Sequence, residues 1–192
     1  MADISITTTS KPRAAASGQA SVQAAAGEPY FDLIELLFFA YRDFVGDPDE
    51  VLAKLGFGRA HHRVLHFVNR NPGMKVADLL DVLKITKQSL GRVLKQLIDE
   101  GYVVQKEGAN DRRQRLLYVS PAGEALAMKL AGLQTARISR VLAELGPGAR
   151  EAARRFLAGM IDATDRDHVL RLIARSDSLA ERERAGARDD NP

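Results

Sequence analysis

Apolar residues recur three and four positions apart along most of the chain, a spacing typical of helices with one buried face. The segment 30–45 is apolar on most faces of the helix that it predicts, so that helix must be buried against more than one neighbour. Other periodic segments predict helices at 48–55, 58–69, 76–83, 121–145 and 150–174. The pattern therefore predicts a mainly α-helical protein.

The segment 86–119 predicts one further helix and then a change to β structure. Thr86 can cap the helix at its start, and Gly101 suits a left-handed residue at its end. Two β-forming runs, 102–104 and 116–119, then flank a turn rich in Gly, Asn and Asp. The apolar face of the helix consists of Leu90, Val93, Leu94, Leu97 and Ile98. With the helix at 76–83 just before it, this order predicts a helix-turn-helix followed by a β-hairpin.

The polar side of this helix and the tip of the hairpin carry residue types that recognise duplex DNA. Gln pairs with adenine edges, and Arg and Lys pair with guanine edges or phosphates. A cationic hairpin tip can reach phosphates or the minor groove. The predicted DNA-contacting residues are Thr86, Lys87, Gln88, Ser89, Arg92, Lys95, Arg112, Arg113 and Arg115, with Asp111 orienting Arg113. The alternative is a solvated helix face and a solvated hairpin with an internal Asp111–Arg113 ion pair.

Gly91 does not fit an ordinary helix. A glycine inside a helix costs about 1 kcal/mol relative to alanine. We expect it to permit a close approach of the helix to DNA or to a neighbouring element.

The motifs of this region resemble those of the MarR family of bacterial winged-helix regulators. The resemblance rests on the helix-turn-helix, then GYVVQKE, then NDRRQRLLYVSPAGEAL, and it spans roughly residues 30–175. The family's Asp-x-Arg wing pattern is matched by Asp111 and Arg113, whereas Ser120 stands where the family usually has Thr. The segments FFAYRDF, GRAHHRVLHFVNRNPGMK and ITKQSL look most like PetP-type regulators of alphaproteobacteria.

The resemblance implies a winged helix-turn-helix with a small β-hairpin wing and with N- and C-terminal dimerisation helices. The expected parts are a disordered tail (1–27), N-terminal dimerisation helices (28–57), the DNA-binding region (58–120), C-terminal dimerisation helices (121–175) and a second disordered tail (176–192). The winged module is too small to cover the apolar faces of the terminal helices, which independently predicts a homodimer. A monomeric helical bundle is the alternative.

Composition and charge agree with a DNA-binding protein. The net charge is only +3, but residues 58–115 hold twelve Lys and Arg against six Asp and Glu, whereas residues 28–55 hold two against seven. The positive charge on the predicted DNA-binding region favours phosphate contact. Cysteine is absent, which excludes disulfides and thiol sensing by this chain. With no signal-peptide pattern and no apolar run of membrane-spanning length, we expect a cytoplasmic protein, nucleoid-associated when bound to DNA, and no membrane partner.

The histidines do not suggest an enzyme. His62 and His66 are four residues apart on one predicted helix, a spacing that can bind a metal, but no carboxylate or cysteine on that helix completes a site. No catalytic or phosphate-binding motif is present, so we expect no catalytic residues and no cofactor. By the family resemblance, a small aromatic or anionic effector would bind between the dimerisation helices and the winged module. The candidate residues are Phe38, Tyr41, Arg42, His62 and His66, for which simple packing is the alternative.

The sequence thus predicts a homodimeric transcriptional regulator that binds a pseudo-palindromic operator on double-stranded DNA. Two alternatives stay open, namely a winged-helix module for protein–protein interaction without DNA binding, and a haem- or metal-responsive regulator on the same dimer. The operator, the target genes, the effector and the sign of regulation are not written in the sequence.

Overall fold

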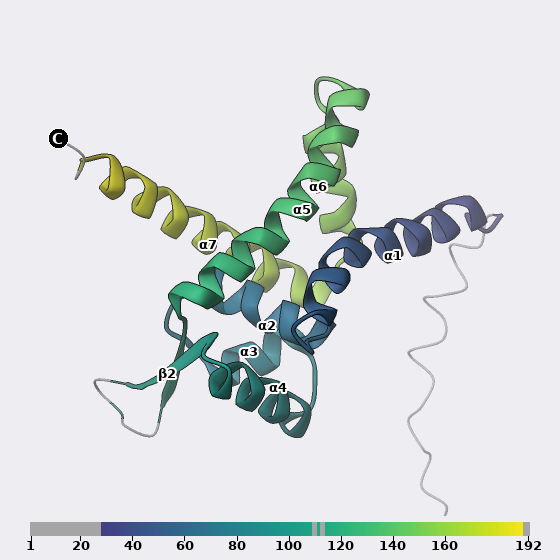
Figure 1. Ribbon diagram of the computed structural model, residues 1–192. Helices are drawn as coiled ribbons and strands as arrows, with labels where there is room; N and C mark the ends of the chain where they lie inside the picture. Colours follow the sequence, from purple (N-terminus) through teal and green to yellow (C-terminus); the bar gives the residue numbers. More distant parts are fainter. Residues whose placement is uncertain (1–27, 109–110, 112–113, 190–192) are drawn as a thin grey trace, which may run out of the picture. The chain divides into compact units, whose positions relative to one another are not determined.

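The computed structural model describes residues 28–108, 111 and 114–189, and it is mainly helical with one small sheet, as predicted (Figure 1). The elements are α1 (Phe31–Ala53), α2 (Arg59–Arg70), β1 (Met74–Lys75), α3 (Val76–Leu83), α4 (Lys87–Asp99), β2 (Val103–Glu107), β3 (Arg115–Val119), α5 (Pro121–Leu145), α6 (Ala149–Gly159) and α7 (Ala163–Asp189). The predicted tail at 1–27 lies outside the described residues. Within them, no helix is long and apolar enough to cross a membrane.

The chain divides into two compact units at the boundary between Ala40 and Tyr41. The described part of the first unit is the N-terminal half of α1 with the residues just before it. Its large apolar side chains are exposed, with Tyr30 at 72% and Phe38 at 68%. The sequence predicted burial for this helix, whereas the N-terminal half of α1 is exposed in this single chain.

The second unit holds the core, which is built mainly by leucines and valines of the helix-turn-helix, the sheet and the flanking helices. Residues from α2, α3, α4, β2, β3 and α5 form one buried cluster that includes Leu65, Leu79, Leu97 and Leu117. The predicted helix-turn-helix is confirmed. Lys84 ends α3 with a positive φ of 50°, and two residues separate it from the first residue of α4.

The sheet contains one strand more than the sequence predicted. The predicted hairpin pairs β2 with β3, from Val103 opposite Val119 to Glu107 opposite Arg115. The short strand β1 adds to the other edge of β3, with Met74 opposite Leu117, so the strand order is β1-β3-β2. Two residues are too few to show an alternating pattern, which is why the sequence gave no signal for β1. This strand ties the wing to the segment that leads into α3.

The start of α5 is fastened to the base of the wing. Ser120 caps the helix by accepting a hydrogen bond from the backbone N–H of Gly123 at 3.0 Å, and its hydroxyl donates to the carbonyl of Gly101 at 2.6 Å. Gly123 is buried here, and a Cβ added to it would lie 2.0 Å from the carbonyl oxygen of Tyr102. Only glycine therefore fits without a shift of the backbone.

Three predicted boundaries are wrong. The separate helix predicted at 48–55 is the end of α1, which continues through Pro48. Pro48 and Leu52 are fully buried, and their packing outweighs the unfavourable effect of proline inside a helix. The last helix that the sequence predicted, at 150–174, is two separate helices, α6 and α7. Arg166 secures the break by donating to the carbonyls of residues 158, 159 and 161, each at 2.9 Å.

The tail predicted from Ser176 onward is also wrong over its described part, because α7 continues to Asp189. Ser176 itself is 4% exposed, and its hydroxyl donates to the side chain of Asn71 at 2.9 Å. The charged composition suggested a loose segment, whereas the chain continues here as a helix and is anchored near its predicted start by Ser176.

Candidate nucleic-acid interface

Helix α4 is oriented by a cap at its start and by a leucine face along its length. The hydroxyl of Thr86 accepts from the backbone N–H of Ser89 at 3.1 Å and donates to the Ser89 hydroxyl at 3.0 Å. Leu90, Leu94 and Leu97 are buried in the core. Because these leucines fix the rotation of the helix about its own axis, the opposite face is turned to solvent.

That opposite face carries the polar residues that the sequence singled out. Lys87, Gln88, Arg92 and Lys95 are all exposed. Lys95 forms an ion pair with Asp99, with 2.5 Å between Nζ and Oδ2, whereas the other three make no side-chain hydrogen bond or ion pair with any residue that the structure describes. Their donors and acceptors are therefore available to an external partner.

A residue with the same polar character, Gln96, has a different role. Its side-chain oxygen lies 2.9 Å from Nε2 of His61, whose Nδ1 accepts from the backbone N–H of Gly58 at 3.1 Å. His61 thus links the start of α2 to α4, a contact between distant residues that sequence periodicity could not indicate.

The wing strands β2 and β3 follow α4 in the chain (Figure 1). They carry further charged side chains. Arg115 pairs with Glu107 across the hairpin at 2.9 Å, and both side chains are at least half exposed. Lys106 lies over the ring of Tyr118, 4.8 Å from its centroid. Arg112 and Arg113 lie outside the described residues, and so does the predicted orienting contact between Asp111 and Arg113.

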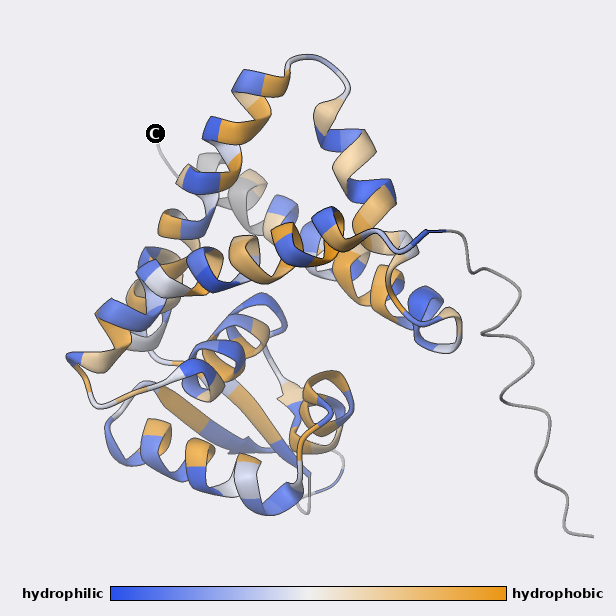
Figure 2. Cartoon of the chain, turned by 90° about the vertical axis from the view of Figure 1, so that its right-hand side faces the viewer, coloured by the Kyte–Doolittle hydropathy of each residue, from blue (hydrophilic) through white to orange (hydrophobic). Residues whose placement is uncertain are grey.

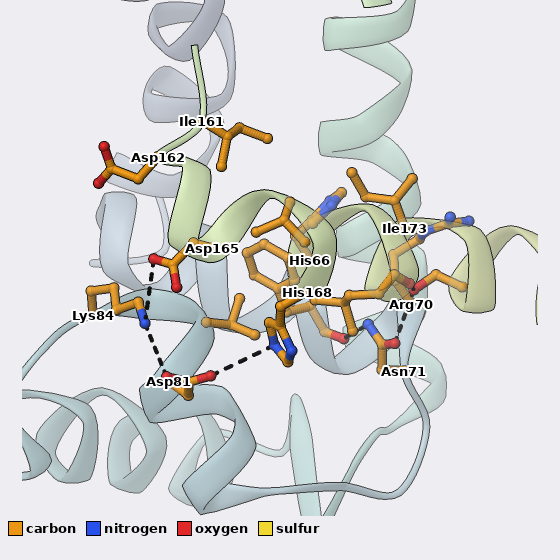
Figure 3. Close-up of a pocket in the computed structure, with 15 residues that line it drawn as sticks. His66, Arg70, Asn71, Asp81, Lys84, Ile161, Asp162, Asp165, His168 and Ile173 are labelled. Carbon is orange, nitrogen blue, oxygen red and sulfur yellow. Dashed lines mark hydrogen bonds and ion pairs between the residues drawn. The ribbon is translucent and has the colours of Figure 1, made fainter. Parts of the chain in front are cut away.

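The five residues predicted for an effector pocket are not gathered into one cavity. A cavity of about 550 Å³ is lined by α2, α3, α7 and the loop before α7, and His66 is the member of the predicted set that lines it (Figure 3). Phe38 belongs to the first unit. Tyr41 is exposed, and Arg42 pairs with Asp43 at 2.8 Å.

Burial determines the charge of the two candidate histidines. Burial lowers the pKa of His62. It also lowers the pKa of His66, where its effect is larger than that of the neighbouring His62 and Arg70, which act in the same direction. His66 is nevertheless exposed at the surface, and its ring makes an edge-on contact with that of Phe67, with centroids 5.2 Å apart. At neutral pH the uncharged form of both imidazoles therefore predominates. No group of three metal-ligating side chains is present in the part of the chain that the structure describes.

Most charged groups at the rim of the cavity already have partners. Asp81 pairs with Lys84 at 3.0 Å and with His168 at 3.6 Å, and Lys84 also lies 3.6 Å from Asp165 (Figure 3). The hydrogen bond to Lys84 lowers the pKa of Asp81. Arg70 pairs with Asp177 on α7. These pairs connect α3 and α2 to α7. The surface of the cavity between them is mainly apolar, although polar and charged side chains also line it.

Comparison with known proteins identifies relatives of this chain by sequence and by fold. The model of the MarR family matches residues 55–114. The transcriptional regulator PetP of Rhodobacter capsulatus is 44% identical over 135 residues, which cover 70% of this chain and 81% of PetP. Two solved structures share the fold. FabT of Streptococcus pneumoniae in complex with DNA has a TM-score of 0.62 at 13% identity, covering 69% of this chain and 94% of FabT. NadR in complex with 4-hydroxyphenylacetate has a TM-score of 0.59 at 20% identity, covering 73% and 97%.

Proposed function

The chain belongs to the MarR family of helix-turn-helix transcriptional regulators, and from this premise we propose that it binds a pseudo-palindromic DNA operator as a homodimer. Its relatives are regulators and not enzymes. The observation that carries the proposal is the solvent-facing side of α4, where Lys87, Gln88 and Arg92 project with no partner among the described residues. These are side chains that read base edges and phosphates in the major groove.

The second copy is proposed because the helices outside the winged module expose too much apolar surface. Leu145 on α5 is 68% exposed. Phe156 and Leu157 on α6, and Met160 just after it, are each more than half exposed. Figure 2 shows hydrophobic segments along both helices on either side of the loop that joins them. A soluble chain rarely leaves so much apolar surface uncovered, and a twofold copy covers it with the same surface.

A twofold dimer predicts the arrangement of half-sites in the DNA that it binds. It presents two copies of α4, so the operator should contain two inverted half-sites roughly one turn, about 10 bp, apart. Thr86, Ser89 and Lys95 would assist Lys87, Gln88 and Arg92 in the major groove. Arg112, Arg113 and Arg115 of the wing would contact phosphates or the minor groove, with Asp111 orienting Arg113.

The proposal is tested by titrating the protein against two duplexes at two salt concentrations. One is the best-bound duplex enriched by the protein from a library with a random core of about 20 bp, and the other is a scrambled duplex of the same composition. We expect tight binding to the enriched duplex and weak, salt-sensitive binding to the scrambled one. Absence of binding at low salt would favour a protein-interaction module instead, and a Soret band or bound metal in the purified protein would indicate the haem- or metal-responsive alternative.

The variant Arg92→Ala tests the role of the α4 face. We expect affinity for the enriched duplex to fall by about 5- to 100-fold more than affinity for the scrambled duplex, because base-edge contacts are worth about 1–3 kcal/mol each. Arg171→Ala, which removes an exposed arginine from α7, is the control and should bind both duplexes nearly as the wild type does. Equal losses on the two duplexes would contradict a base contact by Arg92.

We further propose that the cavity beside His66 binds a small aromatic effector. Arg70 and Lys84 at its rim already pair with carboxylates, and the walls are mainly apolar. An uncharged ring with one group that hydrogen-bonds to His66 suits this lining better than an anion does. Since α3 and α7 both border the cavity, a ligand that prefers one arrangement of the helices would change DNA affinity through that preference.

The effector proposal predicts a selective increase in thermal stability. We expect the uncharged 4-hydroxyphenylacetamide to raise the Tm by about 3–5 °C at roughly ten times its Kd, and 4-hydroxyphenylacetate to raise it less at the same concentration. The compounds differ in charge at one end only, so the comparison isolates the charge preference. His66→Ala should abolish the increase. A larger effect of the carboxylate would restore the sequence-based expectation of an anionic ligand.

A further inference from the structure

Gly91 lies in the middle of α4, where glycine is unfavourable, and nothing within the described structure requires it. It is exposed, and no atom would lie within 4 Å of a Cβ built on it. Its φ is negative, in contrast to glycines such as Gly73 and Gly101, so its backbone could accept any residue. Neither packing nor backbone geometry in the free protein explains a residue that weakens the helix.

The place of Gly91 on the helix gives the explanation. Residues three and four positions apart share a helix face, so Gly91 lies between Gln88 and Lys95, with Arg92 beside it. Gln88 and Arg92 are side chains proposed above to contact DNA. Gly91 is therefore a gap in the middle of the proposed contact surface, and not at its edge.

We infer that Gly91 sets the depth to which α4 enters the major groove, by letting its backbone come within contact distance of the DNA at that point. The inference rests on the proposed DNA-binding function. Glycine is the residue that permits close approach of a backbone to a ligand. A side chain at position 91 would hold the helix away from the DNA and lengthen every base contact made by its neighbours. The cost of glycine to the free helix is then offset by sequence-specific binding.

The variant Gly91→Ala tests this inference because stability and binding should change in opposite directions. Alanine is the better helix former, so we expect the Tm to rise by about 2–4 °C. We expect affinity for the enriched duplex to fall at least about tenfold, with less than about a twofold change for the scrambled duplex. The matched control is Gly132→Ala on α5, which is also exposed, mid-helix and without neighbours within 4 Å. It should raise the Tm similarly and leave DNA binding unchanged.

A second variant separates close approach from helix flexibility. Valine is larger than alanine but a poorer helix former. A steric role predicts that Gly91→Val binds the enriched duplex more weakly than Gly91→Ala, whereas a flexibility role predicts partial recovery. Recovery, or binding by Gly91→Ala as tight as that by Gly132→Ala, would overturn the inference while leaving the DNA-binding proposal intact. Failure of the wild type to bind any duplex would overturn both.

Discussion

Replacing Gly123 with alanine should lower the free energy of unfolding by about 2–3 kcal/mol and the Tm by about 4–8 °C. The new Cβ would lie 2.0 Å from the carbonyl oxygen of Tyr102. That oxygen cannot move easily, because it accepts a hydrogen bond from the backbone N–H of Ser120 at 3.0 Å. The first turn of α5 must therefore move away from the wing, and the loss outweighs the better helix propensity of alanine. Urea and thermal unfolding followed by circular dichroism measure both values.

The control for this prediction is the same substitution further along the same helix. Gly132 has no neighbour within 4 Å of its Cβ position, so Gly132→Ala should stabilise the protein by about 1 kcal/mol. The opposite signs expected at positions 123 and 132 isolate the contact with Tyr102 from any general effect of alanine on α5. If the two variants changed stability equally, the close approach of α5 to the wing would be contradicted.

The double variant Leu145→Glu/Phe156→Glu should convert the protein to a monomer and reduce affinity for the enriched duplex by at least about 100-fold. Both side chains are more than half exposed in the single chain, so the charges should not unfold it. At a twofold interface the same change would bury four unpaired charges. A monomer presents one α4 in place of two and loses the gain from simultaneous binding of both half-sites. Light scattering gives the mass, and titration of the enriched duplex gives the affinity.

A matched control adds the same charge to another face of α5. Ser139 and Ala143 are exposed, and the helical period places them roughly opposite Val141 and Leu145. We expect Ser139→Glu/Ala143→Glu to remain dimeric and to bind DNA nearly as the wild type does. A dimer that survived Leu145→Glu/Phe156→Glu, with its circular dichroism unchanged, would show that this apolar surface is not the interface.

Local signals in the sequence were sufficient for the helix-turn-helix and the wing. Thr86 caps α4, Gly101 has a positive φ of 77° after it, and Ser120 with Pro121 begins α5, each as expected from the chemistry of caps. The exposed polar face of α4 followed from the spacing of its leucines. These features depend on residues close in the chain, which is why periodicity and capping rules identify them.

The features that were missed depend on contacts between distant residues. From the sequence, Pro48 marked the start of a separate helix, but its burial keeps it inside α1. Ser176 marked the start of a loose tail, but its hydroxyl donates to the side chain of Asn71. The role of His61 depends on Gln96, thirty-five positions away. The effector residues were placed by analogy with a family, and analogy cannot give the side chains that line a particular cavity. Of that set, His66 lines the cavity described here.

The short strand β1 and the charged strand β2 have a consequence for how this chain associates in a crowded solution. The sheet has two open edges, and unpaired strand edges are templates for aggregation. One edge, β1, is two residues long, and the other carries Gln105, Lys106 and Glu107, which oppose pairing with another strand. The large exposed apolar surfaces lie instead on helices, whose backbone groups are already satisfied. Self-association through such surfaces favours a closed pair of chains over an open-ended fibre.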